Sequence, residues 1–142
     1  MIRVFVFPSV FFLLFSFVGC NEAPNNSKTK AAGVPDIIFK TVDAKTFKDL
    51  IDKKEGVLID VNTPREYKEG HIAGAKNMDF FDPSFEDEIA RLDKSKTYLI
   101  YSRTEHRSSK AMDKFRSQLI FKTINLKGGT LAWEKESLPL EK

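Results

Sequence analysis

The residues with the greatest chemical capacity in this chain form a short polar loop, Ser102-Arg103-Thr104-Glu105-His106-Arg107, directly after the apolar run Tyr98–Tyr101. A serine hydroxyl becomes a nucleophile only beside a positioned base and an oxyanion site, and the nearness of His106 in sequence does not supply that geometry. Backbone N–H groups at the start of a following helix instead favour an anion. Arg103 and Arg107 add positive charge on either side of the loop, whereas Glu105 opposes it.

The only cysteine of the chain is Cys20, far from this loop in sequence. The chain has two histidines, His71 and His106. We therefore expect no metal site, because a zinc site needs about four such ligands. The pattern also calls for no cofactor, and we interpret His71 as a residue that fixes the turn after Gly70.

Cys20 ends an N-terminal segment with the pattern of a secretory signal. Arg3 is followed by the apolar run 4–18, which is shorter than the roughly 18–20 residues of a transmembrane helix. Ser16-Phe17-Val18-Gly19-Cys20 resembles a bacterial lipobox, although Phe17 stands where leucine is usual. The resemblance implies that Cys20 is lipidated, with acyl chains such as palmitate, and becomes the mature N-terminus. An ordinary cleaved signal with a stray cysteine is the alternative.

The chain is expected to have three parts: a signal peptide at residues 1–19, a lipidated N-terminus and flexible tether at 20–35, and one folded domain at 36–142. A lipid on Cys20 would hold the domain at the bacterial cell envelope, on the periplasmic face. Asn21, in place of a retention aspartate, favours the outer membrane. Without Arg3, the 23 basic residues become 22 against 20 acidic ones, a balance that argues against nucleic-acid binding.

Apolar runs and helical spacings alternate through the folded domain. Strands are expected in 37–39, 57–61, 72–77, 98–101 and 120–126. Helices are expected after Asp43, from Pro64 to about Tyr67, after Ser84, over 108–118 and from Gly128-Gly129 onward. This alternation predicts an α/β domain with a largely parallel sheet. Ligands of such sheets bind beyond the carboxyl ends of strands, where Asp60 and Ser102 are expected to lie.

Three segments in this order resemble the signatures of rhodanese-like domains. The first comprises 58–61, Glu66-Tyr67 and Gly70-His71-Ile72-Ala73-Gly74-Ala75; the second is the six-residue loop 102–107; the third is 128–133 followed by Leu138-Pro139. The resemblance covers residues 37–140. It implies a three-layer fold with a central, mainly parallel sheet of about five strands flanked by helices.

The resemblance also gives a role to the first loop position. In active family members this residue is a cysteine that carries a persulfide, and sulfur passes from a donor such as thiosulfate to a thiophilic acceptor. Here the position holds Ser102, and oxygen forms no persulfide. Asn62 stands where the family commonly has an arginine that organises the site, and Arg65 is a candidate substitute. Asp60 is expected to act as a structural hydrogen-bond acceptor, and Trp133 to be packed.

These observations favour an anchored rhodanese-like domain that is inactive as a sulfurtransferase and binds an anion or a protein partner outside the cytoplasm. The expected anion-binding loop comprises Ser102, Arg103, Thr104, Glu105, His106 and Arg107, supported by Asp60 and His71. The alternative is an active sulfurtransferase with an unusual mechanism, or one in which Ser102 is an engineered replacement of cysteine. A phosphatase is disfavoured because the phosphatases of this fold use a longer loop and a cysteine.

Overall fold

The structure is a computed structural model that describes residues 36–142. The expected signal peptide, Cys20 and the whole of the expected tether lie outside the described residues. Within the described range, no helix combines the length and the apolar character needed to cross a membrane.

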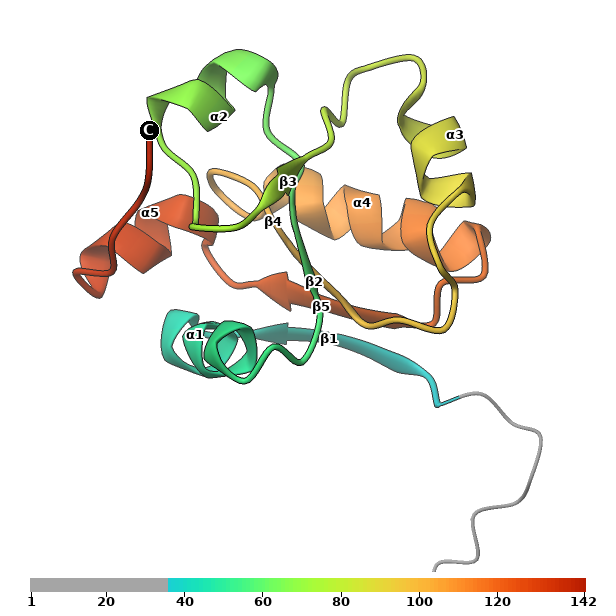
Figure 1. Ribbon diagram of the computed structural model, residues 1–142, viewed down its shortest axis with the longest axis horizontal. Helices are drawn as coiled ribbons and strands as arrows, with labels where there is room; N and C mark the ends of the chain where they lie inside the picture. The colour runs from blue at the N-terminus through green and yellow to red at the C-terminus, as the bar shows by residue number, and fades with distance from the viewer. Residues whose placement is uncertain (1–35) are drawn as a thin grey trace, which may run out of the picture. The chain divides into compact units, whose positions relative to one another are not determined.

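Five strands and five helices alternate along the described chain (Figure 1). In order they are β1 (Ile38–Val42), α1 (Ala44–Asp52), β2 (Val57–Asp60), α2 (Pro64–Glu69), β3 (Lys76–Asn77), α3 (Phe85–Ala90), β4 (Tyr98–Tyr101), α4 (His106–Ser117), β5 (Lys122–Leu126) and α5 (Gly129–Lys135). The strands form one sheet in the order β1-β5-β4-β2-β3, and every neighbouring pair is parallel. The predicted α/β architecture is therefore confirmed.

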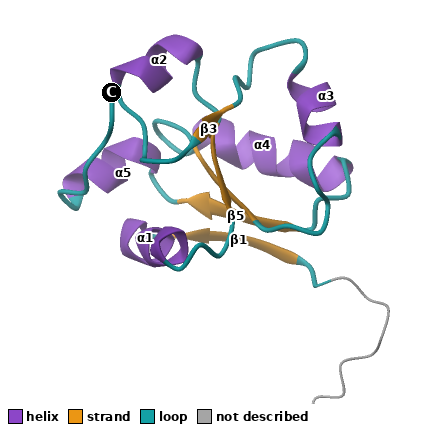
Figure 2. Cartoon of the chain, viewed as in Figure 1, coloured by secondary structure: helices purple, strands orange, loops and turns teal. Residues whose placement is uncertain are grey.

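Side-chain alternation along the strands builds a separate core on each face of the sheet, because successive residues of a strand point to opposite faces. Leu58, Leu99 and Tyr101 pack with residues of α1 and α5, including Phe47 and Trp133. The residues that alternate with them pack on the other face against α3 and α4. The strands thus lie between two helical layers, as the cartoon shows (Figure 2).

Two of the helices, α1 and α2, begin at residues whose side chains cap them. Asp43 accepts the Thr46 N–H at 2.8 Å at the start of α1, as predicted. Thr63 and Glu66 form a reciprocal capping box at the start of α2, with Pro64 in the first turn. This box fixes Glu66 on the side of α2 that meets α4.

Three predicted boundaries were wrong, two of them for identifiable reasons. β1 continues through the polar Lys40 and Thr41, because it pairs with β5 along its whole length at the edge of the sheet. The predicted strand 72–77 is reduced to Lys76–Asn77. Gly74, with a φ of 79°, turns the chain inside that segment. In addition, α4 begins two residues earlier than predicted.

Candidate functional site

The polar loop lies where β4 passes into α4, at the carboxyl edge of the sheet. Ser102 is buried, with 1% of its surface exposed. Its hydroxyl donates to the Ser108 Oγ and accepts the Ser108 N–H, each at 3.3 Å. The Ser108 hydroxyl in turn donates to the Glu105 carbonyl oxygen at 2.9 Å. The hydroxyl chain therefore ends on a backbone carbonyl, and no histidine or carboxylate is placed to accept the Ser102 proton.

The rest of the loop presents unpaired backbone donors. The N–H groups of residues 104–107 donate no hydrogen bond to any part of the described chain. They precede or open the 12-residue helix α4, whose N-terminal end carries a partial positive charge. His106 is exposed and takes no part in the Ser102 hydrogen bonds. The loop therefore keeps the donor set of an anion cradle.

Contacts from the end of β2 and from α5 hold the loop in this shape. The Asn62 side-chain oxygen accepts the Arg103 N–H at 2.9 Å. The Ser102 and Arg103 carbonyl oxygens accept the N–H groups of Thr130 and Leu131 in the first turn of α5, at 3.0 and 3.2 Å. Asn62, where the resemblance described above leads us to expect arginine, thus holds the loop through a direct hydrogen bond.

Glu105 has a left-handed backbone, with φ of 77°. Its carboxylate accepts the Gly128 N–H at 2.8 Å. The hydrogen bond turns this charge toward the start of α5, so Glu105 helps to hold the loop.

The two loop arginines have different surroundings. Arg107 forms a bidentate ion pair with Glu66, with both N···O distances 2.6 Å. Hydrogen bonding from Arg107 lowers the pKa of Glu66 to about 2. Arg65, the candidate substitute for the family arginine, is exposed and pairs with Glu69 on its own helix. Of the two loop arginines, Arg103 alone has no ion-pair partner within the described residues.

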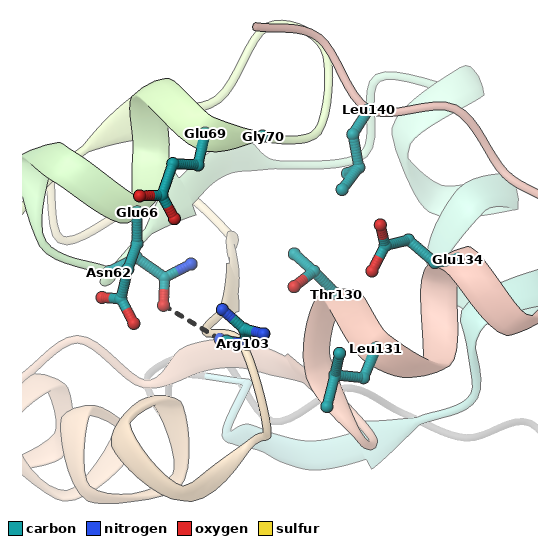
Figure 3. A pocket seen from close by; sticks show the side chains of 9 residues that line it. All are labelled: Asn62, Glu66, Glu69, Gly70, Arg103, Thr130, Leu131, Glu134 and Leu140. Carbon is teal, nitrogen blue, oxygen red and sulfur yellow. Dashed lines mark hydrogen bonds between the residues drawn. The ribbon is translucent and has the colours of Figure 1, made fainter.

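A pocket of about 120 Å³ opens beside the loop (Figure 3). Residues from the end of β2, α2, the loop and α5 surround it, together with one residue near the C-terminus. They are Asn62, Glu66, Glu69, Gly70, Arg103, Thr130, Leu131, Glu134 and Leu140. Ser102 does not line this pocket.

The two predicted supporting residues lie behind the loop. The Asp60 Oδ1 accepts the Asn62 N–H at 2.7 Å, while its Oδ2 is buried without a hydrogen-bond partner. His71 stacks on the Tyr67 ring with centroids 3.8 Å apart, and its backbone pairs with Glu141 in both directions. His71 therefore supports the turn and the C-terminal segment. Within residues 36–142, no cluster of three or more metal-ligating side chains could hold an ion.

Comparison with known proteins agrees with this architecture. The family model for the rhodanese-like domain matches residues 43–136. This chain belongs to the rhodanese-like domain family. The protein called "Putative sulfurtransferase YtwF" of Bacillus subtilis is 34% identical over 102 residues, which cover 71% of this chain and 96% of that protein.

Two further matches are to a longer protein and to a solved domain of similar size. An uncharacterized protein of Synechocystis sp. is 31% identical over 109 residues. The match includes 72% of this chain but only 56% of that longer protein. The solution structure of a rhodanese-like domain from Anabaena sp. superposes with a TM-score of 0.65 at 28% identity, covering 73% of this chain and 80% of that one.

Sequence reasoning missed several residues around the loop of this rhodanese-like domain. Glu66 was noted only as part of a signature, and Thr130 and Glu134 were not considered as site residues. The Thr63-x-x-Glu66 spacing of a capping box was a readable signal for Glu66. Trp133 is packed as expected, with 2% exposure and its indole N–H donated to the Pro139 carbonyl oxygen at 2.9 Å.

Asp60 gives the domain a defined pH dependence. Burial raises the pKa of Asp60 from 3.8 to about 6. The folded state therefore binds this proton more tightly than the unfolded state, so the stabilisation is full below about pH 4 and is lost as the pH rises to about 6. Relative to Asp60→Asn, the unfolding free energy of the natural protein should fall by about 3 kcal/mol across this window. Urea unfolding at several pH values measures it.

The control for this comparison is Asp113→Asn, at an exposed position on α4. It should show no such divergence from the natural protein between pH 4 and 7. A natural protein that instead gains stability relative to Asp60→Asn as the pH rises would contradict the buried, proton-retaining state of Asp60.

Proposed function

We propose that this chain is a lipid-anchored rhodanese-like domain of the bacterial cell envelope that does not transfer sulfur and instead binds a ligand at the loop. Ser102 occupies the place at which active family members carry the persulfide cysteine. The observation that carries the proposal is the absence of any cysteine from residues 36–142. A persulfide needs a thiolate, and the folded domain has no thiol to form one.

Serine chemistry does not replace the missing thiol. The Ser102 hydroxyl donates toward Ser108 and, through it, to the Glu105 carbonyl oxygen. A carbonyl cannot remove the serine proton, and an unactivated hydroxyl is a weak nucleophile. The Bacillus subtilis relative is named as a putative sulfurtransferase. We expect the same fold to support that reaction only when a thiol is present.

The binding role is supported by the unpaired donors of the loop. Four consecutive N–H groups, at residues 104–107, lie at the start of α4 without hydrogen-bond acceptors among the described residues. Arg103 adds a guanidinium group that is not neutralised by an ion pair. Donors held in place in this way favour a small anion or an anionic group on a larger partner, because they need no reorganisation when it binds.

The anchoring role rests on the lipobox-like sequence that ends at Cys20. A diacylglyceryl group with a further acyl chain would hold the domain stably, whereas one chain gives only marginal binding. Residues 20–35 would then act as a polar tether between the membrane and the domain. The proposed location is the periplasmic face, with Asn21 favouring the outer membrane.

One experiment tests anchoring and inactivity together. The full chain and Cys20→Ser are expressed in a bacterial host with an envelope, fractionated and assayed for thiosulfate:cyanide sulfurtransferase activity. The full chain should be recovered with membranes and Cys20→Ser in the soluble fraction, and neither should exceed the buffer rate. Turnover by the natural chain would overturn the proposed inactivity. A natural chain that remains soluble would overturn the anchor.

A further inference from the structure

The pocket beside the loop contains one cation and one anion that lack ion-pair partners. The Arg103 guanidinium group enters from the loop and the Glu134 carboxylate from α5, and the two lie on different sides of the space (Figure 3). Neither side chain makes an ion pair or hydrogen bond with any other described residue. A ligand that carries both charges could therefore pair with each of them.

The other pocket acids are already engaged by arginines. Glu66 is held by Arg107 in the bidentate pair, and Glu69 is bonded to Arg65 at 3.0 Å. Their charges are thus offset, the first strongly and the second weakly because Arg65 is exposed. Glu134 remains the carboxylate with no competing cation.

Neutral donors lie on the same side of the pocket as Arg103. The Asn62 side-chain oxygen is fixed by the Arg103 N–H, which leaves its amide N–H₂ turned to the pocket (Figure 3). The Thr130 hydroxyl also lines the space. A guanidinium, an amide and a hydroxyl together form a donor set for a carboxylate.

The size and the apolar lining of the pocket further limit the kinds of ligand that it can bind. A volume of about 120 Å³ has room for roughly ten waters, at about 10–15 Å³ for each on this measure, so the pocket suits a small molecule. Leu131 and Leu140 add apolar surface at two separate edges of the pocket, against which a small side chain can pack (Figure 3).

We infer that this pocket binds a small zwitterion of amino-acid size, with its carboxylate on Arg103, Asn62 and Thr130 and its ammonium group on Glu134. The inference goes beyond the proposed anion binding at the N–H groups of residues 104–107, because this second site shares only Arg103 with that loop. The site lies beside Ser102 rather than on it, so it is separate from the position of the persulfide.

The test uses the full chain in detergent micelles, labelled with ¹⁵N, and follows amide shifts during titration. L-alanine is the probe, with ethylamine and propionate as matched single-charge analogues. L-alanine should shift the Thr130 and Leu131 amides with a dissociation constant on the order of millimolar. Ethylamine and propionate should each bind at least about tenfold more weakly, because each lacks one charge-assisted contact.

Variants test whether Arg103 and Glu134 bind the two charged groups of the ligand. Arg103→Gln and Glu134→Gln should each weaken L-alanine binding by about tenfold or more. Arg91→Gln and Glu136→Gln remove the same charges outside the pocket, the second of them from the end of α5, and should leave binding unchanged. Unchanged spectra of the unliganded variants verify their folding.

Three results would overturn the inference: no shift at L-alanine concentrations up to about 0.1 M, equal binding of either single-charge analogue, or equal loss in the control variants. Sulfate that shifts only residues 104–107, with no response to L-alanine, would also overturn it while leaving the proposed anion cradle intact. Thiosulfate turnover by the natural chain would instead refute the proposed function alone.

Discussion

Replacing Ser102 with cysteine is expected to give this chain sulfurtransferase activity. The variant should form a thiolate near neutral pH and turn over thiosulfate and cyanide. The expected pKa of the new thiol lies at least about one unit below the ordinary 8.5. The causes are the Ser108 N–H directed at this side chain and the N-terminal end of α4 beside it.

The spacing around Ser102 also suits a sulfur atom. The Oγ lies 3.3 Å from both the Ser108 nitrogen and the Ser108 Oγ. The hydroxyl–hydroxyl distance exceeds the usual 2.5–3.0 Å of such bonds. Sulfur is larger than oxygen and would fill this space, and the Ser108 hydroxyl can turn to donate to a thiolate.

The expected reaction follows the family chemistry and balances in two displacements. The Cys thiolate attacks the outer sulfur of thiosulfate, the S–S bond of thiosulfate breaks, and sulfite leaves. Cyanide then attacks the outer sulfur of the persulfide, thiocyanate leaves, and the thiolate is restored. The free N–H groups of residues 104–107 would bind the anionic sulfur in between.

The measurements are thiolate absorbance against pH, which needs no access for a reagent, and thiocyanate formation. Ser108→Cys is the matched control, since it places a buried thiol on the same chain without the helix-start donor that serves position 102. An ordinary or raised pKa at position 102 would contradict the donor geometry. A lowered pKa without turnover would show that the buried loop no longer admits thiosulfate.

The order and type of the elements could be predicted because some of the strands are compact apolar runs bounded by turn residues. Val57–Asp60 and Tyr98–Tyr101 are examples, and both proved to be central, buried strands. Their ends placed Asp60 and Ser102 at one edge of the sheet without any tertiary information. What periodicity could not give was the polar second half of β1, which is held by its pairing with β5 rather than by apolar side chains.

The electrostatics of the loop could not be predicted, because they depend on contacts between residues far apart in sequence. Arg107 and Glu66 are 41 residues apart, and Glu105 and Gly128 are 23 apart. From sequence, Arg107 counts as a free cation and Glu105 as a repelling anion. In the folded domain the first is neutralised and the second serves as an acceptor. Local patterns show which charges exist, but only the fold shows which remain available to a ligand.

The second large effect is expected at Gly129, where a single added methyl group should undo the docking of the loop. Gly129 has φ of 63°, and a Cβ there would lie 2.1 Å from the Ser102 carbonyl oxygen and 2.5 Å from that of Arg103. Both contacts are with backbone, so no side-chain rotation relieves them. The same two carbonyls accept the Thr130 and Leu131 N–H groups, so a shift would also break these bonds.

Gly129→Ala should therefore lose about 4 kcal/mol or more of unfolding free energy, near the upper limit for single substitutions. Gly74→Ala is the matched control, because Gly74 has φ of 79° with nothing within 4 Å of a built Cβ. It should cost only the left-handed backbone penalty of about 1–2 kcal/mol. Urea unfolding of both variants separates the two causes. Equal losses would mean that α5 can withdraw from the loop, and the close contact of Gly129 with Ser102 would then not be what holds the loop in place.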